Sequence, residues 1–215
     1  MIINFQLLLQ TLPQLAHAAL YSLLIALGAT LLGLSGGTCI ALLQHKGNRI
    51  INFFISIFLM IIRGTPMIVQ IVLLYYVLNL PIDPLYIAIL AIGINSSAYI
   101  SQTIKTGIQS IAPGELEAAF VMGFSQTQII RYIILPQAFR AIFPSLINEF
   151  VTLIKDSSLA YIIGVNELFK AGKNLTSTSY DVITIYLAIT FFYFMMTTSV
   201  SVLLNYYEKK WESQC

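Results

Sequence analysis

Long apolar segments separated by short polar ones make up most of the chain. A helix that spans a membrane needs about 20 largely apolar residues, and several segments have this character. One of them is overlong and is interrupted by Arg63-Gly64-Thr65-Pro66. The segments lie at 18–43, 50–80, 85–110, 138–155 and 181–205. The pattern predicts an all-α polytopic membrane protein with five transmembrane helices, in a single domain over residues 1–215.

The stretches between these segments differ in character. Residues 1–17 are interpreted as an interfacial segment, broken by Pro13, that leads into the first span. Residues 111–137 are mixed in character and too polar to cross lipid. Residues 156–180 contain glycine, serine, asparagine and several charges, and they predict a loop with a short helix.

The composition supports a membrane protein. Hydrophobic residues make up 58% of the chain and charged residues only 9%, whereas soluble domains carry about 25% charged residues. The net charge of +2 and the lack of a basic run argue against nucleic acid as a partner. Cys39 and Cys215 are too few for a disulfide framework. His17 and His45 lack the spacing of metal ligands, so no metal site is expected.

The basic residues predict an orientation, because cytoplasmic loops carry an excess of Lys and Arg. With the N-terminus outside, only Lys170 and Lys173 fall in an outer loop, and Lys155 lies near the outer end of a span. The residues placed on the cytoplasmic side are Lys46, Arg49, Lys105, Arg131, Arg140, Lys209 and Lys210. We therefore expect the N-terminus outside, the C-terminus in the cytoplasm, and residues 111–137 in a cytoplasmic loop.

That loop reads GELEAAFVMGFSQTQIIRYIILP over residues 114–136, which predicts an amphipathic helix, a break and a second helix. Glu115 and Glu117 lie in the first turn, where the helix dipole favours negative charge. Ala118 and Ala119 are small enough to let another surface approach closely. Gly123 permits a backbone turn that a side chain would hinder. These features alone fit either an ordinary amphipathic connector or a helix pair that docks into a partner's groove.

The detailed spacing of the loop resembles the EAA loop of bacterial ABC importer permeases. The matching positions are Glu117-Ala118-Ala119, then Gly123 after three residues, then Ile133-x-Leu135-Pro136 after nine more. Under this resemblance the loop is the coupling segment that docks an ATPase. The residues assigned to docking are Glu117, Ala118, Ala119 and Gly123.

Other segments resemble the polar amino acid permeases, which serve histidine, arginine, glutamine, glutamate and opines. They are Arg63-Gly64-Thr65-Pro66 followed by Gln70, Ala98-Tyr99 leading to Gly107-Ile108, and Lys155-Asp156-Ser157-Ser158-Leu159. Two residues depart from the family pattern: Gln102 stands where the family usually has Glu, and Lys105 where it usually has Arg. The departures put in question any ion pair carried over to that place.

The resemblance implies a fold like that of type I ABC importer permeases, in a bacterial inner membrane. It also implies a dimer with a like or unlike permease subunit, two ATP-binding subunits, and an extracytoplasmic binding protein that delivers an amino acid substrate. The chain has no G-x-x-x-x-G-K-[ST] phosphate loop. It is therefore expected to be no enzyme and to hold no cofactor, with ATP and Mg bound by the partner ATPase.

Ionisable and polar groups inside the spans are candidates for substrate contact, because such groups are costly in lipid. Arg63 lies about 20 Å into its segment at 1.5 Å per residue, next to a helix break of the kind that lines cavities in transporters. Thr65 and Gln70 are the better contact candidates there. A buried kink in which Arg63 pairs with a carbonyl is the alternative.

Two further helical faces are polar. Glu149, Lys155 and Asp156 fall on one side of the fourth predicted span. A protein-lined cavity that holds an amino acid would account for these charges. Alternatively, Lys155 and Asp156 lie among lipid headgroups and neutralise one another. Asn95, Tyr99, Gln102 and Thr106 share a face typical of interhelical packing or of a cavity lining. The predicted substrate-binding set is Thr65, Pro66, Gln70, Asn95, Tyr99, Glu149, Lys155, Asp156, Ser157 and Ser158.

The charge of this set favours a basic substrate. Asp156 and Lys155 match the ammonium and carboxylate that any amino acid carries, which leaves Glu149 for a cationic side chain. Arginine, lysine or histidine is therefore expected; if Glu149 pairs internally, for example with Arg63, glutamine or another polar amino acid fits instead.

A secondary carrier is the rival class of transporter, but it has no need of an ATPase-docking loop. The chain also lacks the H-E-x-x-H motif and a plausible catalytic pair of histidines, which argues against an intramembrane enzyme.

Overall fold

The computed structural model describes residues 4–79 and 81–212. The described residues form helices joined by short connections and contain no strand, which confirms the predicted all-α class. The elements are α1 (Phe5–Lys46), α2 (Arg49–Gly64), α3 (Met67–Leu78), α4 (Pro84–Gln109), α5 (Pro113–Val121), α6 (Gln126–Ile129), a π-helix η1 (Ile130–Ile134), α7 (Leu135–Asp156), a 3-10 helix η2 (Ser157–Ile163), α8 (Leu168–Ser179) and α9 (Val182–Glu212).

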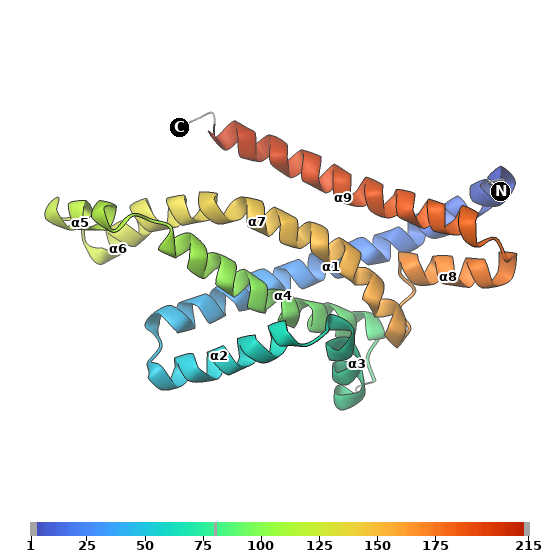
Figure 1. Ribbon diagram of the computed structural model, residues 1–215, viewed down its shortest axis with the longest axis horizontal. Coiled ribbons are helices and arrows are strands. Elements are labelled where there is room, and N and C mark those ends of the chain that lie inside the picture. Colours follow the sequence, from blue (N-terminus) through green and yellow to red (C-terminus); the bar gives the residue numbers. More distant parts are fainter. Residues whose placement is uncertain (1–3, 80, 213–215) are drawn as a thin grey trace.

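The long helices α1, α4, α7 and α9 run lengthwise through the molecule (Figure 1). The two chain ends lie at opposite ends of this bundle. The short helices α5 and α6 project at the end nearer the C-terminus, and α8 lies at the end of the N-terminus. The pair formed by α5 and α6 is thus held away from the rest of the bundle.

Within the described part of the chain, three helices are long and apolar enough to cross a membrane: residues 5–45 of α1, the whole of α4, and residues 182–204 of α9. A fourth crossing results if α2 and α3 count as one broken span. The remaining predicted span is α7, which has a suitable length of 22 residues but carries Arg140, Glu149, Lys155 and Asp156. The count of five spans therefore stays a prediction.

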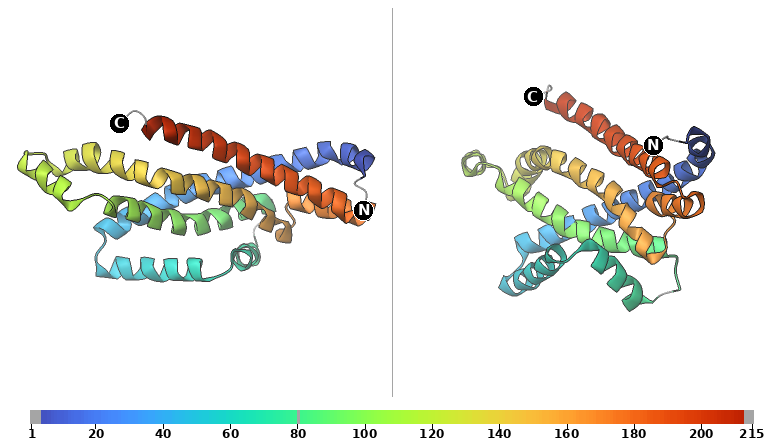
Figure 2. Two further views of the ribbon diagram at one scale, coloured as in Figure 1. Left: turned by 45° about the horizontal axis from the view of Figure 1, so that its top comes forward. Right: turned by 45° about the vertical axis from the view of Figure 1, so that its right-hand side comes forward.

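The break at Arg63-Gly64-Thr65-Pro66 turns the chain sharply. The axes of α2 and α3 differ by 111°, and the left-hand view of Figure 2 shows α3 nearly end-on beside the length of α2. Pro66 precedes the first residue of α3, where its missing N–H leaves no hydrogen bond unmade. The interruption seen in the sequence is therefore a change of direction and not a gentle kink.

The first helix differs from its prediction. The chain does not break at Pro13, because α1 is continuous from Phe5 to Lys46 with this proline inside it. Further along, α1 packs along α4 over the most extensive helix contact in the structure. A Cβ atom at Gly37 would lie 2.8 Å from Ile100 Cγ2 and 3.0 Å from the backbone oxygen of Ser97, so the two backbones approach closely because glycine has no side chain.

The buried core is formed where α1, α4 and the end of α7 meet. It contains Ile25, Ile92 and Leu153, each at most 1% exposed, and η2 packs against it. A second apolar cluster joins α1, α8 and α9. The first of these clusters fixes α4 and α7 relative to one another, and the candidate site lies between those two helices.

Candidate substrate-binding cavity

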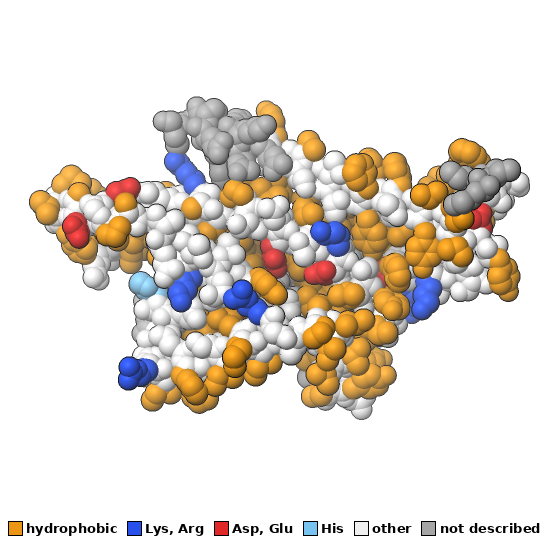
Figure 3. All heavy atoms as spheres, viewed as in Figure 1, with side chains coloured by type: hydrophobic (Ala, Val, Ile, Leu, Met, Phe, Trp, Pro, Cys, Tyr) orange, Lys and Arg blue, Asp and Glu red, His pale blue; other side chains and the backbone are white. Residues whose placement is uncertain are grey.

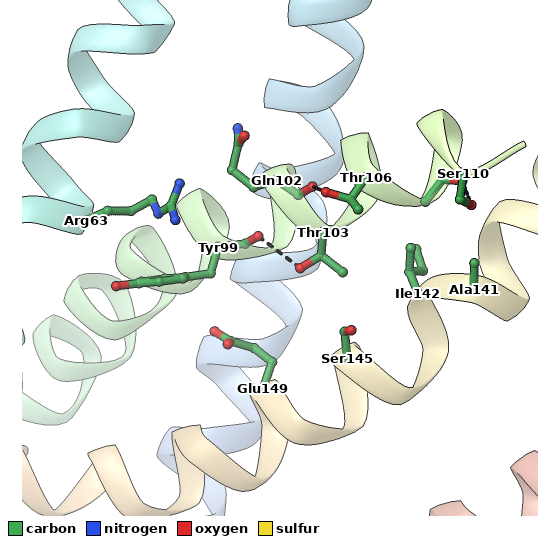
Figure 4. A pocket seen from close by; sticks show the side chains of 11 residues that line it. Arg63, Tyr99, Gln102, Thr103, Thr106, Ser110, Ala141, Ile142, Ser145 and Glu149 are labelled. Atoms are coloured by element: carbon green, nitrogen blue, oxygen red, sulfur yellow. Dashed lines mark hydrogen bonds between the residues drawn. The ribbon is translucent and has the colours of Figure 1, made fainter.

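A cavity of about 380 Å³ lies between the end of α2, the C-terminal half of α4 and the middle of α7. Figure 4 shows the side chains that point into it from these three elements. Its lining consists of Arg63, Tyr99, Gln102, Thr103, Thr106, Gly107, Ser110, Ala141, Ile142, Ser145 and Glu149. The volume suits a small polar molecule, since ligand pockets of proteins span about 300–1,000 Å³.

One acidic and one basic side chain face the cavity, and each is held by a neutral partner. The Ser96 hydroxyl donates a hydrogen bond of 2.7 Å to the Glu149 carboxylate. The Arg63 guanidinium lies over the Tyr99 ring, 5.4 Å from its centroid, which stabilises its charge. The cavity therefore offers an anionic group on α7 and a cationic group on α2 to a molecule bound between them (Figure 4).

Charged groups also gather on the outside of this region. In Figure 3 acidic and basic side chains lie near the centre of the face, over α4 and α7, between hydrophobic surfaces of α2, α3 and α9. Charged side chains at the centre of an otherwise apolar face are typical of a surface that meets protein or a wet cavity, because such groups are costly in lipid.

The predicted site residues separate into groups. Tyr99 and Glu149 line the cavity, and so do Gln102 and Thr106 from the polar stripe of α4. The other members of the predicted set are not among its lining residues. They are Thr65, Pro66, Gln70, Asn95, Lys155, Asp156, Ser157 and Ser158.

Thr65, Gln70 and Asn95 hold the helix break together. The Gln70 amide donates to the backbone oxygens of Ile62 at 2.7 Å and Thr65 at 3.2 Å, and to the Thr65 hydroxyl at 2.7 Å. Its own oxygen accepts a hydrogen bond of 2.9 Å from the Asn95 amide. The last carbonyls of α2 lack partners within the helix, so this cluster supplies them, and it ties the break to α4.

The predicted site residues that follow Glu149 lie at the end of α7 and the start of η2, outside the cavity lining. Ser157 is completely buried, and its hydroxyl donates to the Ile154 carbonyl at 2.7 Å. Lys155 is exposed and Asp156 half-buried at the C-terminal end of α7. The spacing of seven residues keeps Asp156 on the helix face of Glu149, two turns beyond the cavity lining.

Sequence reasoning missed the hydroxyl groups of the cavity. Thr103 and Ser110 share a helical face with Thr106, and Ser145 lies one turn before Glu149 on α7. The signal was a spacing of three, four and four residues, which places side chains on one face of a helix. Thr103, Thr106 and Ser110 donate to backbone carbonyls of their own helix, so their oxygen atoms are left to accept from an ammonium group.

A second missed group is Glu167, a fully buried acid at the N-cap of α8. Its carboxylate accepts hydrogen bonds from the backbone N–H of Phe169 and of Lys170, both at 2.8 Å, from the Tyr193 hydroxyl at 3.1 Å and from the Ser22 hydroxyl at 3.5 Å. It therefore joins α1, α8 and α9. An acid just ahead of an apolar helical run is the sequence signal of such a cap.

The loop at the far end of the bundle contains the predicted helix, break and second helix. Gly123 has φ +84°, a conformation that favours glycine. Glu117 and Ala118 are exposed, whereas Ala119 is fully buried and packs within the chain. Apolar side chains are exposed around the turn, including Val121 at 89% and Met122 at 68%. Such a surface is typical of a contact with another protein.

This loop is attached to the helix that carries Glu149. The Gln137 amide in the first turn of α7 donates a hydrogen bond of 2.6 Å to the Glu115 carboxylate of α5. Between them lies a capping box, in which Ser125 and Gln128 bond to one another's backbone. The segment Ile130–Ile134 then continues as a π-helix into α7, a feature often found at functional sites.

Comparison with known proteins identifies the family. Residues 29–213 match the binding-protein-dependent transport system inner membrane component family. The chain is 37% identical over 190 residues to the glutamine transport system permease protein GlnP of Escherichia coli (strain K12), covering 84% of this chain and 87% of that one. It is 31% identical to the L-cystine transport system permease protein TcyB of Bacillus subtilis (strain 168), covering 92% and 86% of the two chains.

Solved structures agree with this assignment. The chain superposes on an amino acid ABC transporter crystallised with histidines at a TM-score of 0.90 and 31% identity, over 98% of this chain and 100% of the other. It also superposes on the MetNI methionine ABC transporter in an inward-facing conformation at a TM-score of 0.75 and 17% identity, covering 91% and 95% of the two chains, which supports the fold alone. The predicted resemblance to ABC importer permeases is confirmed. The chain belongs to the family of inner membrane components of binding-protein-dependent transport systems and is a permease of an amino acid ABC importer.

Proposed function

We propose that this permease forms the membrane pathway for a basic amino acid and passes it through the cavity between α2, α4 and α7. The observation that carries the proposal is Glu149, a carboxylate that faces the cavity and accepts a hydrogen bond from the neutral Ser96 hydroxyl. A carboxylate away from bulk water is stabilised by a cation. Arginine, lysine and histidine supply one on the side chain as well as on the α-amino group.

A second acid on the same helix face supports a basic substrate. Asp156 lies seven residues beyond Glu149, so α7 presents two carboxylates to one side of the helix. Arg63 is available for the substrate's α-carboxylate, and the Tyr99 ring beneath it keeps the guanidinium in place. The threonine and serine hydroxyls of the cavity then meet the polar parts of the substrate side chain.

Glutamine is the second candidate, and Arg63 favours it. One acid and one base in the same cavity match the ammonium and carboxylate of a neutral amino acid, without a further cation. The relationship to the E. coli glutamine permease supports this candidate as well. The solved relative that was crystallised with histidines supports the basic one.

The two candidates are separated by transport measurements on the complete transporter in proteoliposomes. Uptake of labelled arginine, lysine, histidine and glutamine is compared for the wild type and Glu149→Gln, which keeps the size and removes the charge. Loss of basic amino acid uptake by the variant, with glutamine uptake unaffected, supports the basic substrate. A wild type that carries glutamine and ignores every basic amino acid rejects it. Asp83→Asn serves as the control, since it changes an exposed N-cap acid of α4 to an equally good cap.

We further propose how the chain assembles. It pairs with a second permease subunit, identical or different, and each subunit docks one ATPase through α5 and α6. ATP and Mg are bound by those ATPases, and an extracytoplasmic binding protein delivers the amino acid. The N-terminus and α8 lie outside, and the C-terminus and the coupling loop lie in the cytoplasm. The exposed Val121 and Met122 at the tip of the loop support the docking role.

A further inference from the structure

A second cavity, of about 350 Å³, lies apart from the substrate-binding cavity, between the last turns of α1, the first turns of α2 and the last turns of α4. Its lining is mostly polar and consists of Ala41, Gln44, His45, Asn52, Ser56, Lys105, Ile108 and Gln109. All three helices end or begin here, so the cavity lies at the level where spans leave the apolar part of a membrane. We call it the helix-end pocket.

The helix-end pocket is basic. Lys105 and His45 are exposed at its wall, and Arg49 is exposed at the start of α2. Residues 41–56 and 102–112 contain no Asp or Glu. Figure 3 shows a histidine together with Lys and Arg side chains around the turn that joins α1 to α2. Such a setting favours an anionic ligand group, because no acid of these segments neutralises the cations.

The pocket wall also has acceptors that are not satisfied. Among the described residues, Gln44 Oε1 and Asn52 Oδ1 are buried and accept no hydrogen bond. The Asn52 amide is fixed, since its nitrogen donates to the Gly47 carbonyl at 3.2 Å. Buried acceptors in folded proteins nearly always have a donor, and one can come from outside the chain. Gln44 and Asn52 both line the pocket, so a ligand bound there is in a position to supply such a donor.

The helices α1 and α2 also carry exposed apolar side chains along the segments that line the pocket. Ile50, Phe53 and Phe54 of α2 are exposed by 66%, 61% and 64%, and Leu42 and Leu43 of α1 by 55% and 47%. A ligand with an anionic group, hydrogen-bond donors and attached hydrocarbon chains matches the pocket and the apolar surfaces of these two helices together. Free amino acids and inorganic phosphate lack the hydrocarbon chains.

We propose that the helix-end pocket binds the headgroup of a phospholipid whose headgroup carries N–H or O–H donors. The phosphodiester lies at Lys105 and His45, the headgroup donors reach Gln44, and the acyl chains lie along the exposed apolar side chains of α1 and α2. Phosphatidylethanolamine and phosphatidylglycerol both have such donors. Phosphatidylcholine has the same phosphodiester, but its quaternary ammonium cannot donate a hydrogen bond, so it is the matched control ligand.

The test is native mass spectrometry of the complete purified transporter, titrated separately with the three lipids. We expect phosphatidylethanolamine and phosphatidylglycerol to bind about 5- to 10-fold more tightly than phosphatidylcholine, the effect of one hydrogen bond. Gln44→Leu should reduce their affinity to that of phosphatidylcholine. Lys105→Gln should weaken all three lipids. Asn174→Leu, a similar exchange at an exposed site of α8, should change none of them.

Several outcomes would overturn the proposal. Equal binding of the three lipids in the wild type would show that water alone satisfies the amide oxygens. Displacement of the bound lipid by millimolar arginine, glutamine or inorganic phosphate would assign the pocket to a soluble ligand. If Lys105→Gln does not assemble, Ser56→Trp replaces it, because a large side chain at this exposed position fills the pocket. Unchanged lipid binding by Ser56→Trp contradicts the assignment.

Discussion

Gly33 on α1 leaves the space that the Ser96 side chain occupies on α4. A Cβ atom at position 33 would lie 2.7 Å from Ser96 Oγ and 3.0 Å from its Cβ, which is too close for an unmoved neighbour. Ser96 in turn donates the hydrogen bond that holds Glu149 at the cavity. The position of a carboxylate on α7 therefore depends on a glycine of α1, a helix that contributes no residue to the cavity lining.

This relationship predicts an effect of Gly33→Ala on substrate affinity. The added methyl group pushes Ser96 away from Glu149, so we expect the KM for the transported amino acid to rise about fivefold, the value of one lost hydrogen bond. Ser96→Ala should have a similar effect, and the double variant should be no worse than either single one. The measurement is uptake kinetics in proteoliposomes. Gly114→Ala is the control, because a Cβ there meets open space; a KM unchanged by Gly33→Ala would contradict the coupling.

Gln70→Leu tests the cluster at the helix break. The substitution keeps the size but removes donors to three oxygen atoms of Ile62 and Thr65. We expect a loss of about 2–3 kcal/mol in the free energy of unfolding, seen as a drop of about 5–10 °C in the melting temperature in detergent. Gln10→Leu, at an exposed position of α1, should leave the melting temperature unchanged. Identical melting of the two variants would show that the cluster does not stabilise the break.

Glu167→Gln tests the buried acid that joins α1, α8 and α9. The new amide group turns a donor toward at least one of the four donors that surround the carboxylate, and the donors it leaves unpaired are buried. We expect destabilisation of about 2–4 kcal/mol, greater than that of Tyr193→Phe, which removes a single hydrogen bond. Thermal unfolding of the purified permease measures this order, and a reversed order would argue against a central role for Glu167.

Gly123→Val tests the coupling loop. A β-branched side chain is strained at φ +84°, at a cost of about 1–3 kcal/mol, so the turn between α5 and α6 should change shape. We expect normal amounts of the permease in the membrane but at least a fivefold loss of copurified ATPase. Gly64→Val, also next to open space but without a positive φ and outside the coupling loop, is the matched control. Normal copurification and transport by Gly123→Val would refute the docking assignment.

Cysteine labelling in sealed cells tests the orientation. Thr178 lies in α8 and is exposed, so a cysteine introduced there should react with an impermeant maleimide added from outside. Cys215, which lies outside the described residues, should react only after the membrane is opened. The experiment requires Cys39→Ser, because Cys39 is exposed on α1. Outside labelling of Cys215 would reverse the proposed topology.

The sequence predicted most helices because their apolar segments are long and their ends carry recognisable signals. Asp83 caps α4 by accepting from the Leu85 N–H at 2.8 Å, and Ser125 with Gln128 forms the capping box of α6. The break predicted at Pro13 was wrong, because packing of α1 against α8 and α9 maintains a helix that local preference would weaken. The residues Arg63-Gly64-Thr65-Pro66 predict a break in the overlong segment, but they do not predict the angle of 111° between the axes of α2 and α3.

The sequence predicted only part of the site. Glu149 and Tyr99 could be recognised because a charge and an aromatic hydroxyl within apolar helices imply a polar environment. Gln70 and Asn95 have the same signature, yet they bond to one another, and this contact depends on the bend between α2 and α3. Helical spacing shows which residues share a face of one helix, but only the tertiary arrangement decides whether that face meets a cavity or another polar side chain.

The attachment of Gln137 to Glu115 makes α7 a lever arm. Glu149 lies 12 residues beyond Gln137, or about 18 Å along the helix axis. A tilt of α7 by about 6° at its coupling end therefore displaces the carboxylate by about 2 Å, enough to make or break a hydrogen bond. A movement of α5 caused by a docked ATPase would therefore shift Glu149 sideways relative to the bound amino acid. Neither α5 nor α7 would have to change its fold.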